Sequence, residues 1–157
     1  MLNVFNVAYY ILDKCGEMST FKLHKLLYYC QAWYMAWNDG NPLFQEDFEA
    51  WVNGPVVREV FNVHKKMYNI DKNFMEDKKN DKQNIDDETK KQIDTVLFYY
   101  GNKRPLQLVA MSHLESPWKE TRKNISVFDL SDNIIDKKKI YEYYKNKEIV
   151  KWSRNNE

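Results

Sequence analysis

The sequence predicts a mainly α-helical protein with about six to seven helices and a small β element. Apolar residues recur with helical spacing over several long stretches of the 157-residue chain. The chain has only four glycines and four prolines, and they fall between these stretches, which indicates long elements with few breaks. The length is typical of one domain. We therefore expect a compact single domain over residues 1–150, followed by a polar tail over residues 151–157.

The first two predicted helices have clear start and stop signals. Asn3 is suited to cap a first helix, and Gly16 is suited to end it. A second helix is predicted from Ser19 or Thr20 to about Asn38, with the strongest periodic signal in the chain. Its apolar stripe comprises Leu23, Leu26, Leu27, Cys30, Trp33, Tyr34 and Trp37. Because the stripe is wide, we expect this helix to be central, with Leu26, Leu27 and Trp33 in structural roles.

The stretch Phe48–Val52 alternates apolar and polar residues in the manner of a half-buried strand. Trp51 lies on the polar phase of this strand, so at least part of its ring should face away from the main core. Gly54 and Pro55 then form a rigid corner. Pro55 suits the first turn of a third helix, because its missing N–H is not needed there.

The second half of the chain predicts further helices separated by polar segments. The composition of residues 69–87 predicts a long polar connection, which we expect to be mobile. Four more helix starts are marked by Asp86 or Asp87, Pro105, Ser116-Pro117 and Asp136, and the last helix should reach about Lys147. Short strands are predicted over Ile125–Leu130 and Ile134–Ile135.

Charge and motifs exclude several classes of function. The formal net charge is +1, which argues against a strongly basic nucleic-acid binder, and nucleic acid is not an expected partner. The sequence has no signal peptide and no membrane-spanning stretch, so we expect a cytoplasmic protein without a membrane partner. The two cysteines form no C-x-x-C motif, and no phosphate-binding or catalytic motif occurs. We therefore predict neither a metal nor a cofactor, and no enzyme.

The three histidines, His24, His64 and His113, lie on three different predicted helices. None is paired at i, i+4 with another metal-ligand type, although a dyad of Cys30 with a histidine assembled in space stays an alternative. His113 falls on the core-facing side of the fifth predicted helix, just before Pro117. We predict that His113 is a buried, hydrogen-bonded structural residue, and that Pro117 is structural too.

Two tryptophans stand at turns, Trp51 in the strand and Trp118 after Ser-Pro at a helix start. Tryptophan is enriched at the energetic centres of protein interfaces. Both rings could instead close over the core and donate their N–H groups to loop carbonyls, and the sequence leaves the two interpretations open. In the first, Trp51, Asn53, Gly54, Pro55 and Trp118 form a partner-binding surface.

Three blocks of this sequence together resemble the Panacea domain, the family of SocA-like antitoxins that are also known as phage-associated proteins. The blocks are K-L-H-K-L-L-Y-Y-C-Q-A-W (22–33), P-L-F (42–44) with F-E-A-W-V-N-G-P-V (48–56), and S-H-L-E-S-P-W (112–118). Their order and spacing match the family pattern over about residues 5–122. One departure is Ser112, where the family pattern has threonine, which puts any role of that hydroxyl in question.

The resemblance implies an antitoxin of a bacterial or prophage toxin–antitoxin pair. Such a protein would neutralise a toxin encoded nearby by direct binding, and one kind of member delivers its toxin to a protease. The implied partners are therefore the cognate toxin and, for an adaptor, a protease chaperone subunit. A DNA-binding regulator of its own operon, using the basic C-terminal third, is the alternative, although no convincing helix-turn-helix is present. A third hypothesis for the function is an enzyme of unrecognised type.

Overall fold

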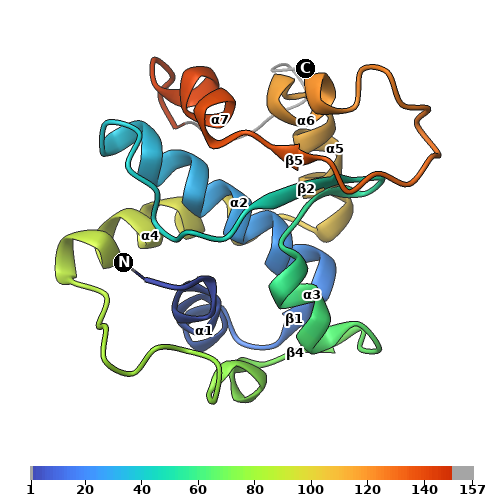
Figure 1. The fold of residues 1–157 in the computed structure, drawn as a ribbon. Coiled ribbons are helices and arrows are strands. Elements are labelled where there is room, and N and C mark those ends of the chain that lie inside the picture. The colour runs from blue at the N-terminus through green and yellow to red at the C-terminus, as the bar shows by residue number, and fades with distance from the viewer. Residues whose placement is uncertain (1, 150–157) are drawn as a thin grey trace.

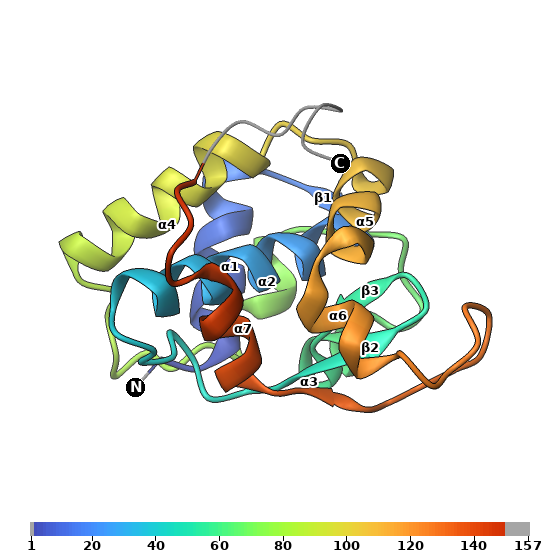
Figure 2. The same cartoon turned by 90° about the horizontal axis from the view of Figure 1, so that it is seen from above.

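Helix α2 (Thr20–Trp37) runs through the centre of the molecule, and most of the other helices pack around it. This computed structural model describes residues 2–149, and Figures 1 and 2 show it from two perpendicular directions. Leu26 and Leu27 are fully buried, and Trp33 is only 3% exposed. The central position that the wide apolar stripe predicted for α2 is confirmed.

Within the described residues, six further helices and five short strands complete the fold. The helices are α1 (Val4–Cys15), α3 (Arg58–His64), α4 (Asp87–Tyr100), α5 (Pro105–Leu114), α6 (Ser116–Thr121) and α7 (Lys137–Tyr144), with a 3-10 helix η1 (Lys72–Met75). The strands are β1 (Met18–Ser19), β2 (Phe48–Trp51), β3 (Gly54–Val56), β4 (Asn69–Ile70) and β5 (Ile134–Ile135). The prediction of a mainly α fold with a small β element is confirmed. The predicted polar tail, 151–157, lies outside the described residues.

The helix caps follow the sequence signals. Asn3 accepts a hydrogen bond from the Asn6 N–H (3.0 Å), and Ser19 accepts one from the Lys22 N–H (3.1 Å). Asp86 does the same for Thr89 at the start of α4 (2.7 Å). Each side chain satisfies a backbone donor that the first turn leaves free. Gly16 ends α1 with a positive φ of 81°, as expected for a glycine stop.

The strands form two small antiparallel sheets. β1 pairs with β4, and β2 lies between β3 and β5 in a three-stranded sheet. In the β2–β3 hairpin Trp51 pairs with Gly54 across a tight turn, and Phe48 of β2 pairs with Ile135 of β5. Phe48 and Ala50 are buried while Glu49 and Trp51 are half-buried, so the predicted strand and the phase of Trp51 are confirmed.

Two local predictions are wrong. Pro55 does not begin a helix but lies in β3 opposite Ala50, and α3 begins at Arg58. Pro55 is tolerated in β3 because this is an edge strand, where a missing N–H breaks no ladder. Residues 125–130 form no strand; a turn closes there with the Asp129 N–H donating to the Ser126 carbonyl (3.0 Å). The Arg122 side chain donates to the Ser126 and Asp129 carbonyls, which a strand would need for pairing with its neighbour.

The polar segment after α3 is anchored along much of its length, in contrast to the mobile connection that its composition predicted. It contains β4 and η1, in which Ile70 and Met75 are fully buried. The side-chain amides of Asn3 and Asn6 donate to the carbonyls of Lys78 (3.2 Å) and Asn80 (3.1 Å). Two apolar side chains and asparagine contacts with α1 therefore hold a segment whose average composition is polar.

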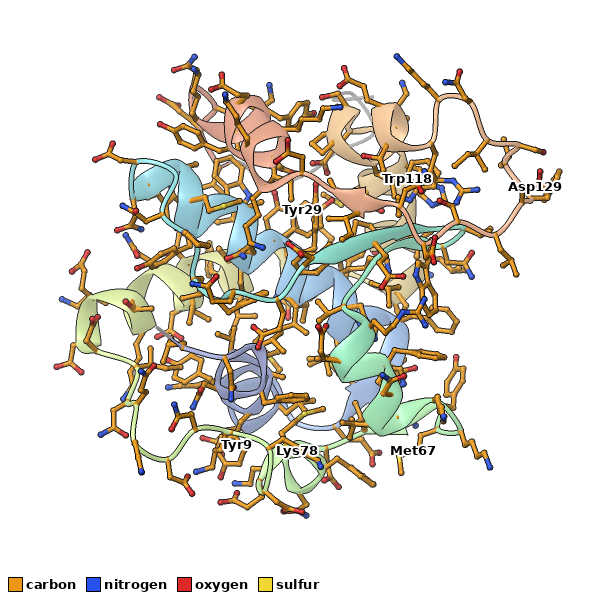
Figure 3. All side chains as sticks on the ribbon, in the orientation of Figure 1. Tyr9, Tyr29, Met67, Lys78, Trp118 and Asp129 are labelled. Atoms are coloured by element: carbon orange, nitrogen blue, oxygen red, sulfur yellow. The ribbon has the colours of Figure 1, made fainter. Side chains whose placement is uncertain are left out.

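The core on the α5–α7 side of α2 contains a cluster of tyrosines around Glu115. Tyr29 stacks on Tyr100 with ring centroids 4.1 Å apart, and the Tyr29 hydroxyl donates to Glu115 Oε1 (2.5 Å). Figure 3 shows Tyr29 on α2, below α6 and α7. Glu115 Oε2 is buried and has no hydrogen-bond partner among the described residues. Burial raises the pKa of Glu115 to about 8, although the Tyr29 hydrogen bond and Lys147 act in the opposite direction.

This shift predicts a pH dependence of stability. The folded chain holds a proton on Glu115 that the unfolded chain releases near its ordinary pKa of 4.5, so this group makes folding stability fall as pH rises from about 5 to 8, whereas the buried histidines, whose pKa values are lowered, act in the opposite direction. Glu115→Gln keeps an acceptor for Tyr29 and removes the titration. We expect it to stabilise the protein by about 1–3 kcal/mol at pH 7, and its gain in stability over the parent should grow as pH rises over that range. Urea unfolding at several pH values measures this. An unchanged slope in the variant would show that Glu115 is not the titrating group.

Candidate partner-binding site

Three stretches that lie far apart in the sequence meet at the β2–β3 hairpin. Helix α2 supplies Lys25 from below, and α5 and α6 supply His113 and Trp118 from one side. The hairpin itself carries Trp51 and Gly54 at its closed end. The blocks that define the family resemblance are thus brought together around a single corner of the backbone.

Lys25 is a fully buried lysine whose ammonium group donates to the Pro55 carbonyl (3.0 Å). It forms no ion pair with any described carboxylate. Burial without a counter-charge lowers the pKa of Lys25 to about 7. The interaction joins the central helix to the hairpin, at the cost of removing an ammonium group from water.

Gly54 is required by this arrangement for two separate reasons. Its φ of +108° lies in a region that residues with a side chain rarely adopt. A Cβ at this position would also lie 2.6 Å from Lys25 Cε and 2.8 Å from Ser112 Oγ. The Ser112 hydroxyl donates to the Val109 carbonyl (2.9 Å), so it packs beneath the corner and does not reach the surface.

The other side of the hairpin rests on Trp118, His113 and Arg122. The Trp118 indole N–H donates to the Trp51 carbonyl (2.8 Å), and the His113 ring stacks on Trp118 with centroids 4.0 Å apart. The buried Arg122 guanidinium donates to the Ala50 carbonyl (2.8 Å). Burial lowers the pKa of His113, while a hydrogen bond with the Val52 backbone acts the other way. His113 is half-buried, and its Nε2 has no partner among the described residues. Of the prediction of a buried, hydrogen-bonded ring, the hydrogen bond is confirmed by the Val52 contact, whereas the ring as a whole is only partly buried.

In front of the hairpin lies a cleft of about 730 Å³. Its walls come from the start of α2, from α3, from the turn after α3 and from residues 130–132. The rings and apolar chains among the lining are Phe21, Trp51, Val52, Val56, Phe61, Met67, Tyr68 and Leu130. Trp51 packs edge-on against Phe61 with centroids 4.8 Å apart, and the Arg58 guanidinium lies 5.2 Å from the Trp51 ring. An apolar cleft with a few polar groups is the usual form of a binding site.

The floor of the cleft contains a pair of buried histidines. The Val57 N–H donates to His24 Nδ1 (3.2 Å), so His24 carries its proton on Nε2, which lies 2.6 Å from His64 Nε2. Burial lowers the pKa of both rings, and the neighbouring Lys25 charge adds to this for His24. The pair is therefore neutral near pH 7. Within residues 2–149, no group of three or more histidine, cysteine or acidic side chains is placed to hold a metal ion.

The five residues predicted to contact a partner take different positions. Asn53 is exposed at the tip of the hairpin, and Trp51 is half-buried in the cleft wall. Gly54, Pro55 and Trp118 are buried beneath them, as is the structural Pro117. Trp118 closes over the core and donates its N–H to a backbone carbonyl, which is one of the two interpretations that the sequence left open. Trp51 does not, because its N–H donates to the Glu49 side chain (Oε1, 3.0 Å).

Sequence reasoning missed Lys25, the histidine pair and Arg122. The second lysine of the K-L-x-K pattern was a usable signal for Lys25, because a charged residue in a run of buried apolar positions needs a specific reason. Nothing in the spacing of His24 and His64 predicted their contact, since they lie on different helices.

Comparison with known proteins defines the class. The family model for "Antitoxin SocA-like, Panacea domain" matches residues 23–119, which span the cleft-forming helices, the hairpin and Trp118. The chain therefore belongs to this family, and the resemblance drawn from the three blocks is confirmed.

A curated relative is "Antitoxin SocA" of Caulobacter vibrioides (strain NA1000 / CB15N). It is 32% identical over 125 residues, which cover 71% of this chain and 66% of the relative. The chain thus spans just under two thirds of that protein's length. No solved structure matches the chain. Among residues 2–149, the structure has no helix that is both long and apolar enough to cross a membrane.

The corner geometry predicts a large cost for any side chain at position 54. Gly54→Ala should lose about 2–4 kcal/mol of stability, because backbone strain adds to the displacement of Lys25 and Ser112. Gly16→Ala is the matched control: it has a similar positive φ, but nothing lies within 4 Å of the added Cβ, so it should lose only about 1 kcal/mol. Urea unfolding compares them. Equal losses would show that space beneath the corner is not limiting.

Proposed function

We propose that this protein is an antitoxin that neutralises a cognate toxin encoded nearby by binding to it directly, without catalysis and without a cofactor. Membership of the SocA-like antitoxin family carries this proposal. The cleft beside the hairpin supports it, because a hollow lined by large apolar side chains is a typical docking site for a protein partner.

The binding surface that we propose centres on Trp51 and Asn53, the two predicted contact residues that reach the surface. Gly54, Pro55 and Trp118 would act from beneath by fixing the backbone of the corner. A partner that binds this corner meets a preorganised surface, so little ordering entropy opposes binding.

Neutralisation by binding has two outcomes, inhibition of the toxin or its delivery to a protease. A protease chaperone subunit would be a second partner in the latter case. Regulation of its own operon by DNA binding rests on the basic C-terminal third of the sequence alone.

Co-expression with each neighbouring gene tests the proposal. A toxic neighbour should be neutralised, and the two proteins should co-purify as a complex. The level of the toxin during rescue separates the modes: it stays constant for inhibition and falls for delivery to a protease. If no neighbouring gene is toxic, or if rescue occurs without a complex, direct binding is the wrong mechanism.

Trp51→Ala should separate binding from folding. The ring is half-buried and lines the cleft, so we expect toxin affinity to fall about 30- to 1,000-fold, with a stability loss below about 2 kcal/mol. Trp37→Ala is the control, since Trp37 is 36% exposed at the other end of α2 and should not change affinity. Calorimetric titration and urea unfolding of the same preparations give both quantities. Tight binding by Trp51→Ala would remove this ring from the interface.

A further inference from the structure

The turn over Ser126–Leu130 presents exposed apolar side chains on a fixed backbone. Val127, Phe128 and Leu130 are 66%, 86% and 92% exposed. The turn projects from the body of the protein between α6 and β5, as both ribbon views and the position of Asp129 in Figure 3 show. Large side chains exposed together in this way are typical of an interaction surface.

Arg122 holds this turn from below. Arg122 is 4% exposed, and its guanidinium donates to the carbonyls of Ser126 (3.0 Å) and Asp129 (2.6 Å), as well as to the Ala50 carbonyl in β2. The turn is therefore tied to the same hairpin that forms the cleft wall. Its backbone order comes from a charged donor with three neutral acceptors, which leaves the apolar side chains free to contact another molecule.

The turn and the cleft form one continuous surface. Leu130, Ser131 and Asp132 line the cleft, and Phe128 lies two residues before Leu130, next to Asp129 at the projecting end in Figure 3. Residues 126–130 lie beyond the part of the chain that the family model matches, 23–119. Most of the cleft lining therefore comes from the matched region, and the turn lies outside it.

The charges around the cleft favour an acidic occupant. Three basic residues, Lys25, Arg58 and Lys65, line it together with one acidic residue, Asp132. Arg58 is paired with Glu49 (2.8 Å) and lies near Asp132, and Lys25 is fully buried and donates to the Pro55 carbonyl. Lys65 is exposed and forms no ion pair with a described residue. Lys65 therefore places one unpaired positive charge at the apolar cleft, which attracts acidic groups and disfavours basic ones.

The backbone disfavours a partner that binds by adding a strand. The outer strand β3 is buried along its length, and Pro55 in its centre has no N–H to donate. The sheet therefore has no accessible edge on this side, and recognition must come from side chains. An amphipathic helix in a groove is the recurring solution for such a surface.

We propose that the cleft and the Ser126–Leu130 turn together bind an amphipathic helix of the toxin, whose apolar face enters the cleft and packs against Phe128 and Leu130, and whose acidic residues face Lys65. The proposal rests on the proposed function and adds the chemistry of the bound segment.

The apolar contacts are tested with the toxin identified by co-expression. Phe128→Ser should weaken toxin binding about 30-fold or more. Phe98→Ser is the control, since Phe98 is 76% exposed on α4 and does not line the cleft, and it should bind as the parent does. Equal affinities of the two variants, with the parent still binding the toxin, would overturn the docking surface while leaving the antitoxin function intact. Loss of self-association by Phe128→Ser without loss of toxin affinity would assign the surface to a second copy of this chain.

Charge reversal tests the acidic character of the bound helix. Lys65→Glu should weaken binding about tenfold or more and reduce its dependence on salt, whereas Lys138→Glu on the exposed face of α7 should change neither. A photo-cross-linker at position 128, with position 98 as the control, then identifies the toxin segment by mass spectrometry. An acidic amphipathic helix supports the proposal; a basic segment, a strand, or no cross-link from position 128 in a complex that forms contradicts it.

Discussion

The hydrogen bond from the buried Lys25 ammonium to the Pro55 carbonyl is the constraint on which the candidate site depends. A lysine in this position loses its hydration and gains only a neutral acceptor, which is why burial lowers its pKa to about 7. In return the central helix is joined to the hairpin at its corner. Since the lysine side chain fills the space beneath position 54, only glycine fits there, and the corner takes a single shape.

Because the corner has one shape, some residues support the site from beneath and others reach its surface. Lys25, Trp118 and Arg122 all bond to backbone carbonyls of β2 or β3, so polar side chains hold the hairpin from two sides. The Trp51 ring, Asn53 and the Ser126–Leu130 turn then point outward from a backbone that is already ordered. Such preorganisation lowers the entropic cost of binding a partner at this surface.

The elements of this fold that depend on local chemistry could be predicted from the sequence. Caps such as Asn3 and Ser19, the stop at Gly16 and the alternation that placed Trp51 on the outer phase all act within a few residues. The site depends instead on contacts between distant segments, such as that of His24 with His64. Pro55 was predicted to begin a helix but lies in an edge strand. Its ring suits both positions equally well, and only its tertiary neighbours decide between them. The family resemblance indicated which blocks matter, but not that they meet at one corner.

The central claim is that the toxin binds the face formed by the hairpin, the cleft and the projecting turn. Hydrogen–deuterium exchange of this chain, free and in complex with its toxin, tests this claim most directly. Slower exchange on binding is predicted for residues 51–54, 64–68 and 126–132, with α4 unchanged. Protection confined to α4 or α7, with the hairpin and the turn exchanging as in the free protein, would contradict it.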